Sequence, residues 1–331
     1  MVKIKDVAAA AGVSTATVSR VLANKPYVSK KVQQRVREVV QRLGYRPNRV
    51  ARNLRARQSS IIALIVSDIQ NPFFQMVSRA VEDTAYAQGF SVMLCNNDEN
   101  PDKEKMYLNL MHDENVAGII FSPTRQTADN FKSIKELNTP MVVIDRRVKN
   151  ASVDNILIDN VESAYEMVSH LIEHGYRRIG AVFGIGSTTG RERYEGYAAA
   201  LKDHGLEPQS ELAKYVHARE SDGYATVARI LKLSPPPDAI FTSNGLLAAG
   251  ALRAILDSQR VIPDEIAFAS FDDTPWSRLV VPAITVIEQP TYEIGQLATE
   301  LLLKRLKDPH RSSRTITLKG KLVLRQSCGC P

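Results

Sequence analysis

Apolar residues in the first 46 positions recur at the three- and four-residue spacing of short amphipathic helices. One apolar face ends at Gly12, a residue that suits a helix C-terminus. A second face follows Ser14 and a third follows Ser29, both natural N-caps, before Gly44 and Pro47 stop the pattern. The three faces consist of Ile4, Val7, Ala8 and Ala11, then Val18, Val21 and Leu22, then Val32, Val36, Val39, Val40 and Leu43. Three helices with a tight turn predict a helix-turn-helix module.

From Ile61 onward, short apolar runs alternate with helix-length amphipathic segments. We expect strands in IIALIVSDI, FSVMLCNN, VAGIIFSP, PMVVIDRR, RIGAVFGIG, DAIFTSN, IAFASFDD and ITVIEQ, and a last strand-like run in TLKGKLVLRQS. Alternating strands and helices predict parallel sheets with helices on both faces. Roughly 270 residues suit two such lobes better than one. Ligands of these sheets bind beyond the carboxyl ends of the strands.

Charge divides the chain into a basic head and a mildly acidic body. Residues 1–58 contain 14 of the 43 Lys and Arg residues and 2 of the 36 acidic ones, a net charge of +12, whereas the remainder carries −5. Such a head suits a polyanionic partner. The alternative, a solvated charged tail, does not explain its apolar periodicity.

Nothing in the sequence indicates a membrane protein or a secreted one. No run approaches the roughly 18 apolar residues of a membrane-spanning helix, so we expect no membrane partner. The start MVKIKDVAAAAG lacks the apolar core of a signal peptide. Three cysteines, Cys95, Cys328 and Cys330, give no disulfide framework. We therefore expect a cytoplasmic location.

The second predicted helix has a bare polar face opposite its apolar one. Thr15, Ala16 and Arg20 lie on this face, and the short side chains of Thr15 and Ala16 allow a close approach to base edges. Arg20 suits a bidentate contact to guanine, and Thr15 and Ala16 suit a thymine methyl. Thr17, Ser19 and Tyr27 suit contacts to phosphates, which position a protein without specifying sequence.

The head resembles the DNA-binding domain of the LacI/GalR family of bacterial transcription regulators. The similarity lies in IKDVAAAAGVSTATVSRVLANKPYVS and RVREVVQRLGYRPNRVARNLR, and continues to the C-terminus. It implies that NRVARNLRAR is a hinge helix that forms on operator DNA, with Asn48 and Arg49 among the DNA-binding residues. The resemblance also implies that Leu54 enters the minor groove, where an apolar wedge kinks the duplex. Alternatively, this basic stretch is a plain linker.

The resemblance further implies two lobes of the periplasmic sugar-binding type with a small effector between them. Each expected ligand residue follows a predicted strand: Phe73, Phe74, Asp145, Arg146, Arg193, Asn244 and Asp272. Aromatic faces with Asp, Asn and Arg suit polyhydroxyl ligands. Two arginines favour an anionic or a highly hydroxylated molecule. Asp145 could instead pair with Arg146 or Arg147, and Phe73 could belong to the core.

Two positions make the ligand hard to infer from the family. Asn244-Gly245 stands where the family usually has Asn-Asp, which removes a carboxylate. Trp276, the only tryptophan, could stack on a sugar ring or form a half-buried lid.

Three further motifs have ordinary explanations, so we expect no metal and no cofactor. HLIEH resembles a metalloprotease motif, but Gly175 follows His174 directly, which indicates a last helical turn with no third ligand. GIGSTTG resembles a dinucleotide loop, but no acidic residue ends the next strand. The cysteines of CGC could bind metal or oxidise, but a frayed chain end is the default expectation.

These observations predict an all-α helix-turn-helix head plus an α/β body with two doubly wound parallel-sheet lobes of the periplasmic-binding-protein (type I) kind. The expected domains are 1–46 for DNA binding, 47–58 for the hinge, and 59–331 for effector binding and dimerisation. The first lobe would hold about 59–160 and 290–315, and the second about 161–289 and 316–331. The protein would be a homodimeric, allosteric repressor, not an enzyme, that binds a pseudo-palindromic duplex. A sugar-modifying or nicotinamide enzyme and a nonspecific architectural protein are the alternatives.

The wedge hypothesis predicts the behaviour of Leu54→Ala. In a gel-shift titration this change should weaken binding to operator DNA well beyond its effect on random DNA, because only the kinked complex uses the wedge. Equal losses on both duplexes would contradict the hypothesis.

Overall fold

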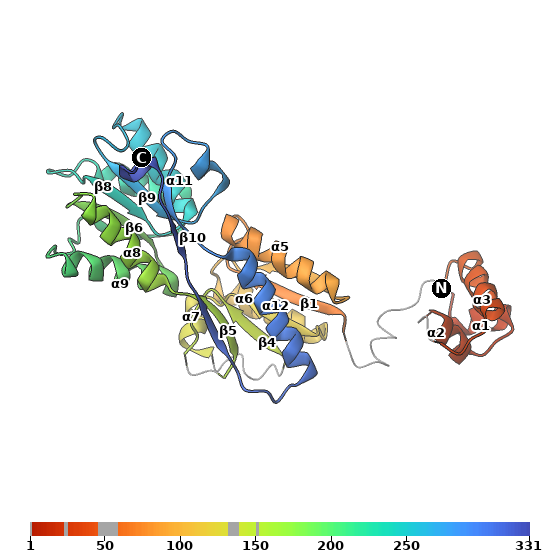
Figure 1. The fold of residues 1–331 in the computed structure, drawn as a ribbon. Coiled ribbons are helices and arrows are strands. Elements are labelled where there is room, and N and C mark those ends of the chain that lie inside the picture. The colour runs from red at the N-terminus through yellow and green to blue at the C-terminus, as the bar shows by residue number, and fades with distance from the viewer. Residues whose placement is uncertain (1, 23–25, 46–58, 132–138, 150–151) are drawn as a thin grey trace. The chain divides into compact units, whose positions relative to one another are not determined.

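The computed structural model describes residues 2–22, 26–45, 59–131, 139–149 and 152–331. The chain divides into two compact units, Met1–Ser59 and Ser60–Pro331 (Figure 1). Asn48, Arg49 and Leu54 lie outside the described residues. Among the residues described, no helix has the length and apolar character to cross a membrane.

The first unit is the predicted three-helix module. Its helices are α1 (Ile4–Ala11), α2 (Thr15–Leu22) and α3 (Lys30–Arg42). Their apolar faces meet in one core that includes Val7, Ala8, Ala11, Val18, Val21, Val36 and Val39. Ser14 caps α2 as predicted, because its Oγ accepts a hydrogen bond of 3.1 Å from the backbone N–H of Thr17. The prediction for Ser29 is wrong in part: it occupies the N-cap position of α3 but makes no capping hydrogen bond.

The second unit contains two six-stranded sheets, which confirms the two-lobed α/β prediction. The first sheet has the order β11-β5-β4-β3-β1-β2 and is parallel throughout. Its strands are β1 (Ile61–Val66), β2 (Ser91–Asn96), β3 (Gly118–Phe121), β4 (Met141–Ile144), β5 (Asp154–Ile158) and β11 (Thr315–Leu318).

The second sheet has the order β12-β10-β9-β8-β6-β7 and is parallel except for β12, which is antiparallel to β10. Its strands are β6 (Ile179–Gly184), β7 (Ala213–Val216), β8 (Ala239–Thr242), β9 (Ala267–Phe271), β10 (Thr285–Glu288) and β12 (Lys321–Val323). The run TLKGKLVLRQS, expected as one strand, thus divides into β11 and β12 in different sheets.

Helices cover both faces of each sheet. They are α5 (Pro72–Ala87), α6 (Pro101–Asp113), α7 (Arg125–Asp129), α8 (Asn160–Glu173), α9 (Thr188–Asp203), α10 (Glu220–Ile230), α11 (Gly245–Asp257) and α12 (Thr291–Lys307), with short 3-10 helices η2 (Pro275–Arg278) and η3 (Gln326–Cys328). Alternate residues of β6 show the pattern, because Phe183 packs in the core with α8 and α9 while Val182 packs in the core with α10 and α11. Continuous apolar strands are the expected result of burial on both faces.

Within Ser60–Pro331 the described chain passes between the lobes three times: from β5 to α8, from β10 to α12, and from β11 to β12. Figure 1 shows the last passage in dark blue, running from the first lobe to the second. Residues 316–318, expected in the second lobe, pair with β5 in the first. The passage therefore lies at 319–320, a few residues beyond the expected boundary.

Asp154 holds the approach to this last passage in place. Its fully buried carboxylate (0% exposed) accepts hydrogen bonds from Arg305 Nη2 at 2.9 Å, Arg311 Nη1 at 3.0 Å and the backbone N–H of Arg314 at 2.8 Å. These donors lie in α12 and in the segment that leads into β11. One carboxylate thus fixes the segment between α12 and β11 against the start of β5.

We expect Asp154→Ala to destabilise the second unit by about 3 kcal/mol, because removal of one partner leaves buried charge unpaired. Asp129→Ala is the control, since Asp129 pairs with Lys149 at 2.8 Å on the exposed surface, where such pairs contribute at most about 1 kcal/mol. Thermal unfolding of both variants measures the difference. Equal shifts in melting temperature would show that the Asp154 network adds nothing to stability.

Candidate functional site

Helix α2 presents a polar surface in the first unit. Thr15, Ala16, Ser19 and Arg20 are exposed on it, opposite the buried Val18 and Val21. The hydroxyl of Thr17 is half-buried and bonds to Ser14 Oγ at 2.9 Å, so it already has a partner within the cap. Tyr27 is 97% exposed at a positive φ of 83°, which places its ring in solvent between α2 and α3. This surface is small, polar and accessible.

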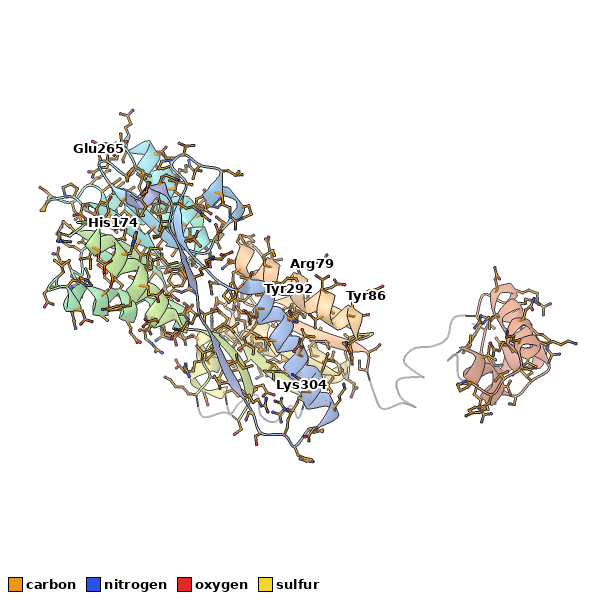
Figure 2. All side chains as sticks on the ribbon, viewed as in Figure 1. Arg79, Tyr86, His174, Glu265, Tyr292 and Lys304 are labelled. Carbon is orange, nitrogen blue, oxygen red and sulfur yellow. The ribbon has the colours of Figure 1, made fainter. Side chains whose placement is uncertain are left out.

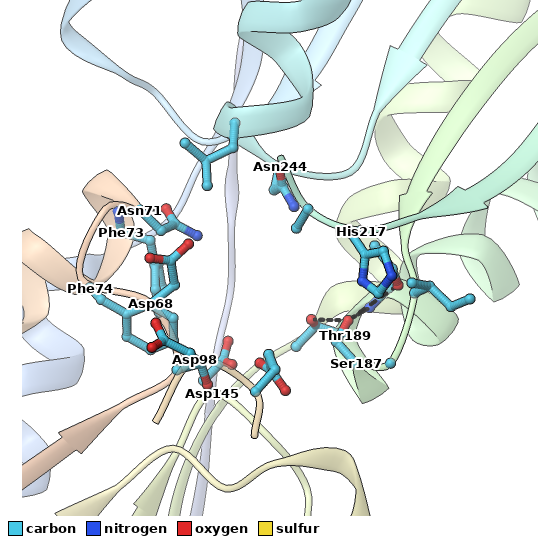
Figure 3. A pocket seen from close by; sticks show the side chains of 18 of the residues that line it. Asp68, Asn71, Phe73, Phe74, Asp98, Asp145, Ser187, Thr189, His217 and Asn244 are labelled. Carbon is cyan, nitrogen blue, oxygen red and sulfur yellow. Dashed lines mark hydrogen bonds between the residues drawn. The ribbon is translucent and has the colours of Figure 1, made fainter. Parts of the chain in front are cut away.

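A cavity of about 1350 Å³ lies in the second unit. Its lining comes from the segments that follow strands β1 to β4 in one lobe and β6 to β10 in the other. In Figure 3, Asp68, Asn71, Phe73, Phe74, Asp98 and Asp145 face Ser187, Thr189, His217 and Asn244 across this space. Parallel strands in both sheets bring these loops together, because all their carboxyl ends lie at one edge.

Phe73 and Phe74 line the cavity and also belong to the core of the first lobe. They follow Asn71, the N-cap of α5, whose side chain accepts a hydrogen bond of 3.0 Å from the backbone N–H of Phe73. Their rings meet edge to face with centroids 4.9 Å apart. Phe73 therefore belongs to the core and lines the cavity at the same time.

Asp145 and Arg146 line the cavity at the end of β4. Arg146 is buried and forms a two-pronged pair with Glu99, with one hydrogen bond of 2.7 Å, and also donates to the carbonyl oxygen of Pro123 at 2.8 Å. Its Nε lies 3.4 Å from Asp145 Oδ2, the pairing considered from the sequence. Burial raises the pKa of Asp145 despite the opposing effect of Arg146 and Arg193. Arg146 is thus largely neutralised by the protein.

Arg193 enters the cavity from α9. It donates from Nε to Asn160 Oδ1 at 2.9 Å and from Nη1 to the carbonyl oxygen of Ser243, and its guanidinium carbon lies 3.8 Å from the ring centroid of Phe271. Burial lowers the pKa of this guanidinium, opposed by Asp272 and Asp145. These contacts fix the orientation of the Arg193 guanidinium but use only some of its N–H donors.

Asn244 and Asp272 lie together on the second lobe's side of the cavity. Asn244 caps α11 through its Oδ1, which accepts from the backbone N–H of Leu247 at 2.9 Å. Asp272 accepts from the backbone N–H of Gly245 at 2.9 Å and from Gln289 Nε2 at 2.5 Å. A Cβ at position 245 would lie 2.7 Å from Thr274 Cγ2, so this packing favours the glycine that replaces the family's carboxylate.

Trp276 does not lie among the residues that line the cavity. It sits in η2, half-buried against the core formed by α10, α11 and the second sheet. The hypothesis that it stacks on a ligand is therefore not supported by its position. The aromatic ring extends the lobe's own core instead.

The structure adds lining residues that we did not single out from the sequence: Asp68, Asn96, Asp98, Glu99, His217, Arg219, Glu220 and Gln289. The strand-end rule alone could have found them, because Asn96 ends β2 and each of the others follows a strand. With them, the cavity lining holds seven carboxylates and four arginines: Asp68, Asp98, Glu99, Asp129, Asp145, Glu220 and Asp272, with Arg125, Arg146, Arg193 and Arg219. Burial, with Asp98 and Glu99 nearby, raises the pKa of Asp68. Lys103 and Lys149 pair with Asp98 and Asp129, so the charges around the cavity are nearly balanced.

Two buried acceptor atoms of cavity-lining residues have no hydrogen-bond partner in the part of the chain that the structure describes: Asn96 Oδ1 and Gln289 Oε1. Buried polar groups are normally paired. Two free acceptors at the edge of a cavity suit a ligand whose groups donate hydrogen bonds, as hydroxyls do. The arrangement can therefore hold a neutral, hydroxyl-rich molecule.

The loop GIGSTTG lies at this cavity too, since Gly184, Ser187, Thr189 and Gly190 line it. Ser187 caps α9 by accepting from the backbone N–H of Gly190 at 2.9 Å. The loop therefore forms the N-cap of α9 at the edge of the cavity.

Two family models match the chain. "Bacterial regulatory proteins, lacI family" matches residues 3–48, and "Periplasmic binding protein-like domain" matches residues 168–328. The chain is 35% identical to a ribose operon repressor of Halalkalibacterium halodurans, covering 99% of this chain and 97% of that protein. It is 32% identical to the transcriptional repressor PurR of Mannheimia succiniciproducens, covering 99% and 98%.

Solved structures agree with these relatives. A lac repressor dimer bound to operator and the anti-inducer ONPF superposes with a TM-score of 0.87 at 26% identity, covering 99% of both chains. The transcriptional regulator CelR in complex with cellobiose gives a TM-score of 0.75 at 27% identity, covering 99% of this chain and 100% of that one.

Proposed function

Because the chain belongs to the LacI family of bacterial regulatory proteins, we propose that its cavity binds a neutral sugar or sugar derivative and that this ligand controls DNA binding. The protein is a DNA-binding transcriptional repressor that acts as a dimer and responds to a small effector. Its relatives are repressors, which are not enzymes.

The observation that carries the choice of ligand is the polarity of the cavity. Seven carboxylates and four arginines line the cavity, and Lys103 and Lys149 pair with Asp98 and Asp129, so the charges are nearly balanced. Arg146 is already paired with Glu99. The cavity therefore offers a sugar acid or a phosphate little net attraction, whereas sugar hydroxyls can donate to carboxylates and accept from Arg193 and Arg146. The edges of Phe73 and Phe74 offer the apolar surface on which a sugar ring packs. One solved relative is described as a cellobiose complex.

On the DNA side, we propose that Thr15, Ala16 and Arg20 contact base edges and that Ser19, Tyr27, Asn48 and Arg49 contact the backbone. Support comes from the exposure of the polar face of α2 and from its opposition to the core. Thr17 fits a phosphate contact only through its backbone or through an exchange of its bond to Ser14. We place Leu54 in the minor groove, as the family pattern implies. The working place of the protein is then the cytoplasm, on the nucleoid when operator is bound.

Control requires that the two lobes change their mutual arrangement on binding. The three passages between the lobes are the segments that such a change bends, and the cavity is lined from both sides of them. Binding to DNA and to effector must then change each other's affinity by the same factor. Leu279 and Val281, which are 80% and 95% exposed in one loop of the second lobe, are our candidates for the dimer contact.

The proposal is tested by a thermal-shift screen followed by a DNA titration. Neutral mono- and disaccharides, sugar acids and nucleosides are compared on the untagged protein, and a specific ligand raises the melting temperature by mass action. We expect a neutral sugar to raise the melting temperature and the corresponding sugar acid to leave it unchanged. Anisotropy titrations with an operator selected from random duplexes should then show a change in affinity of about 5–150-fold. A ligand that leaves operator affinity unchanged would overturn the allosteric account, and turnover of the ligand would favour an enzyme.

Asp145 should make effector binding depend on pH. A hydroxyl donates to the ionised carboxylate, and burial raises the pKa of this group, so affinity should rise as Asp145 ionises and fall at acid pH. Asp145→Asn should weaken binding by about tenfold or more and remove this dependence. Calorimetry across the pH range measures both effects. The control is Asp129→Asn at the same cavity, whose carboxylate pairs with Lys149. An identical pH profile in Asp145→Asn would exclude Asp145 as the acceptor.

A further inference from the structure

Two histidines and two cysteines meet in the second lobe, away from the cavity. His170 and His174 lie one turn apart near the end of α8, and Cys328 and Cys330 belong to the segment around η3. His170 Nε2 lies 3.3 Å from Cys328 Sγ and 3.6 Å from Cys330 Sγ, and His174 Nε2 lies 3.3 Å from Cys330 Sγ. The frayed end expected from the sequence is wrong, since Cys328 is fully buried (0% exposed) in η3.

These separations match those between ligands of one tetrahedral zinc ion. Bonds of about 2.3 Å to sulfur and about 2.05 Å to nitrogen, at the tetrahedral angle, place sulfur and nitrogen about 3.6 Å apart. The potential ligand atoms of His170, Cys328 and Cys330 all lie within 4.8 Å of one another. Little movement is needed to bring these three to a common centre. His174 lies outside this mutually close group and adjoins it through Cys330, 3.3 Å from its Nε2.

The surroundings also prepare these groups as ligands. His174 Nδ1 lies 3.0 Å from the carbonyl oxygen of His170, which fixes a proton on Nδ1 and leaves the Nε2 lone pair toward Cys330. Thr285 Oγ1 donates to Cys328 Sγ at 3.0 Å. A hydroxyl donor at this sulfur stabilises the thiolate form of Cys328. Thiolates are the form of cysteine that binds metals.

Backbone geometry at the chain end brings both thiols to the same histidines. Gly329 adopts a positive φ of 89°, so the chain turns sharply between the two cysteines. A Cβ at this position would also lie 3.2 Å from the hydroxyl of Tyr176. The spacing Cys-Gly-Cys is therefore used here as a turn that presents two sulfurs in one direction.

We propose that His170, His174, Cys328 and Cys330 bind one zinc ion. Two thiolates and two imidazoles in a tetrahedral arrangement favour zinc over hard cations such as magnesium or calcium. The ion would join α8 to residues 328–330, more than 150 residues further along the chain, and all four positions would be protein ligands, as in structural zinc sites.

The proposed site is separate from the effector cavity. None of the four residues lines the cavity. Helix α8 begins at Asn160, whose side chain bonds to Arg193 at the cavity, whereas His170 lies ten residues further along, about 15 Å away at the helical rise. His174 is labelled in Figure 2 on the second lobe. The inference therefore does not rest on the identity of the effector.

The test uses the full-length, untagged protein, freed of metal with a chelator under reducing conditions. Zinc is then added and the bound metal is measured after gel filtration, while cobalt is added to a second sample for absorption spectroscopy. We expect one zinc per chain, a higher melting temperature with zinc, and the sulfur-to-cobalt charge-transfer and strong visible bands of tetrahedral cobalt.

The variants Cys330→Ser and His174→Gln change the two more exposed ligands, so they leave the core intact. Each should weaken zinc binding by more than about 100-fold, the upper end of what loss of a supporting partner alone costs. His204→Gln is the matched control, because His204 caps α9 with Nδ1 2.8 Å from the carbonyl oxygen of Ala200 but is not part of this cluster. It should bind zinc like the unchanged protein.

Several outcomes would overturn the proposal. They are the absence of stoichiometric zinc, unchanged zinc content in Cys330→Ser and His174→Gln, or an octahedral cobalt spectrum. Mass spectrometry of the untreated protein tests for a further contradicting result, a disulfide. A Cys328–Cys330 disulfide that forms readily and does not respond to zinc would assign the cluster to thiol oxidation instead. Circular dichroism of each variant establishes that a loss of zinc binding is not a loss of fold.

Discussion

Parallel pairing of the strands determines where the polar groups of the second unit meet. In a parallel sheet every strand ends at the same edge, so the residues after β1 to β4 gather at one edge and those after β6 to β10 at another. The three passages between the lobes bring these two edges to one cavity. Asp145, Arg193 and Asp272 lie far apart in the sequence, and what they share is that each follows a strand. Strand direction thus determines where the cavity lies, and the particular side chains determine its chemistry.

Much of this architecture can be predicted from the sequence. Strands buried on both faces are continuous apolar runs, and amphipathic helices between them define the order of elements. The strand β5 and the division of the last run into β11 and β12 are harder to predict, because a short strand's partner is chosen by packing elsewhere. Asp154 illustrates the difficulty, since its partners Arg305 and Arg311 are about 150 residues away. The local sequence pattern does not predict such a contact.

The site shows the same division between what local pattern predicts and what it does not. The sequence places Phe73, Arg146, Arg193, Asn244 and Asp272 at strand ends, and all of them line the cavity. Their electrostatic state could not be predicted, because Glu99 neutralises Arg146 from a different loop and removes one of the two charges that favoured an anion. The histidine pair and the cysteine pair each lack further ligands nearby in the sequence. Neither pair is a metal site until the fold brings α8 and η3 together.

The contribution of the last strands to both sheets has a consequence for synthesis of the protein on the ribosome. The three-helix unit contains only contacts between residues close in sequence, so it can fold as soon as it emerges. Neither lobe can do the same, because β11 extends the first sheet and β12 the second. Ser327 then completes the second lobe by accepting from the backbone N–H of Thr285 and donating to the carbonyl oxygen of Phe268. A nascent chain can therefore have a folded three-helix unit while the two-lobed unit is still incomplete. The two-lobed unit is completed only when residues 315–328 have been made.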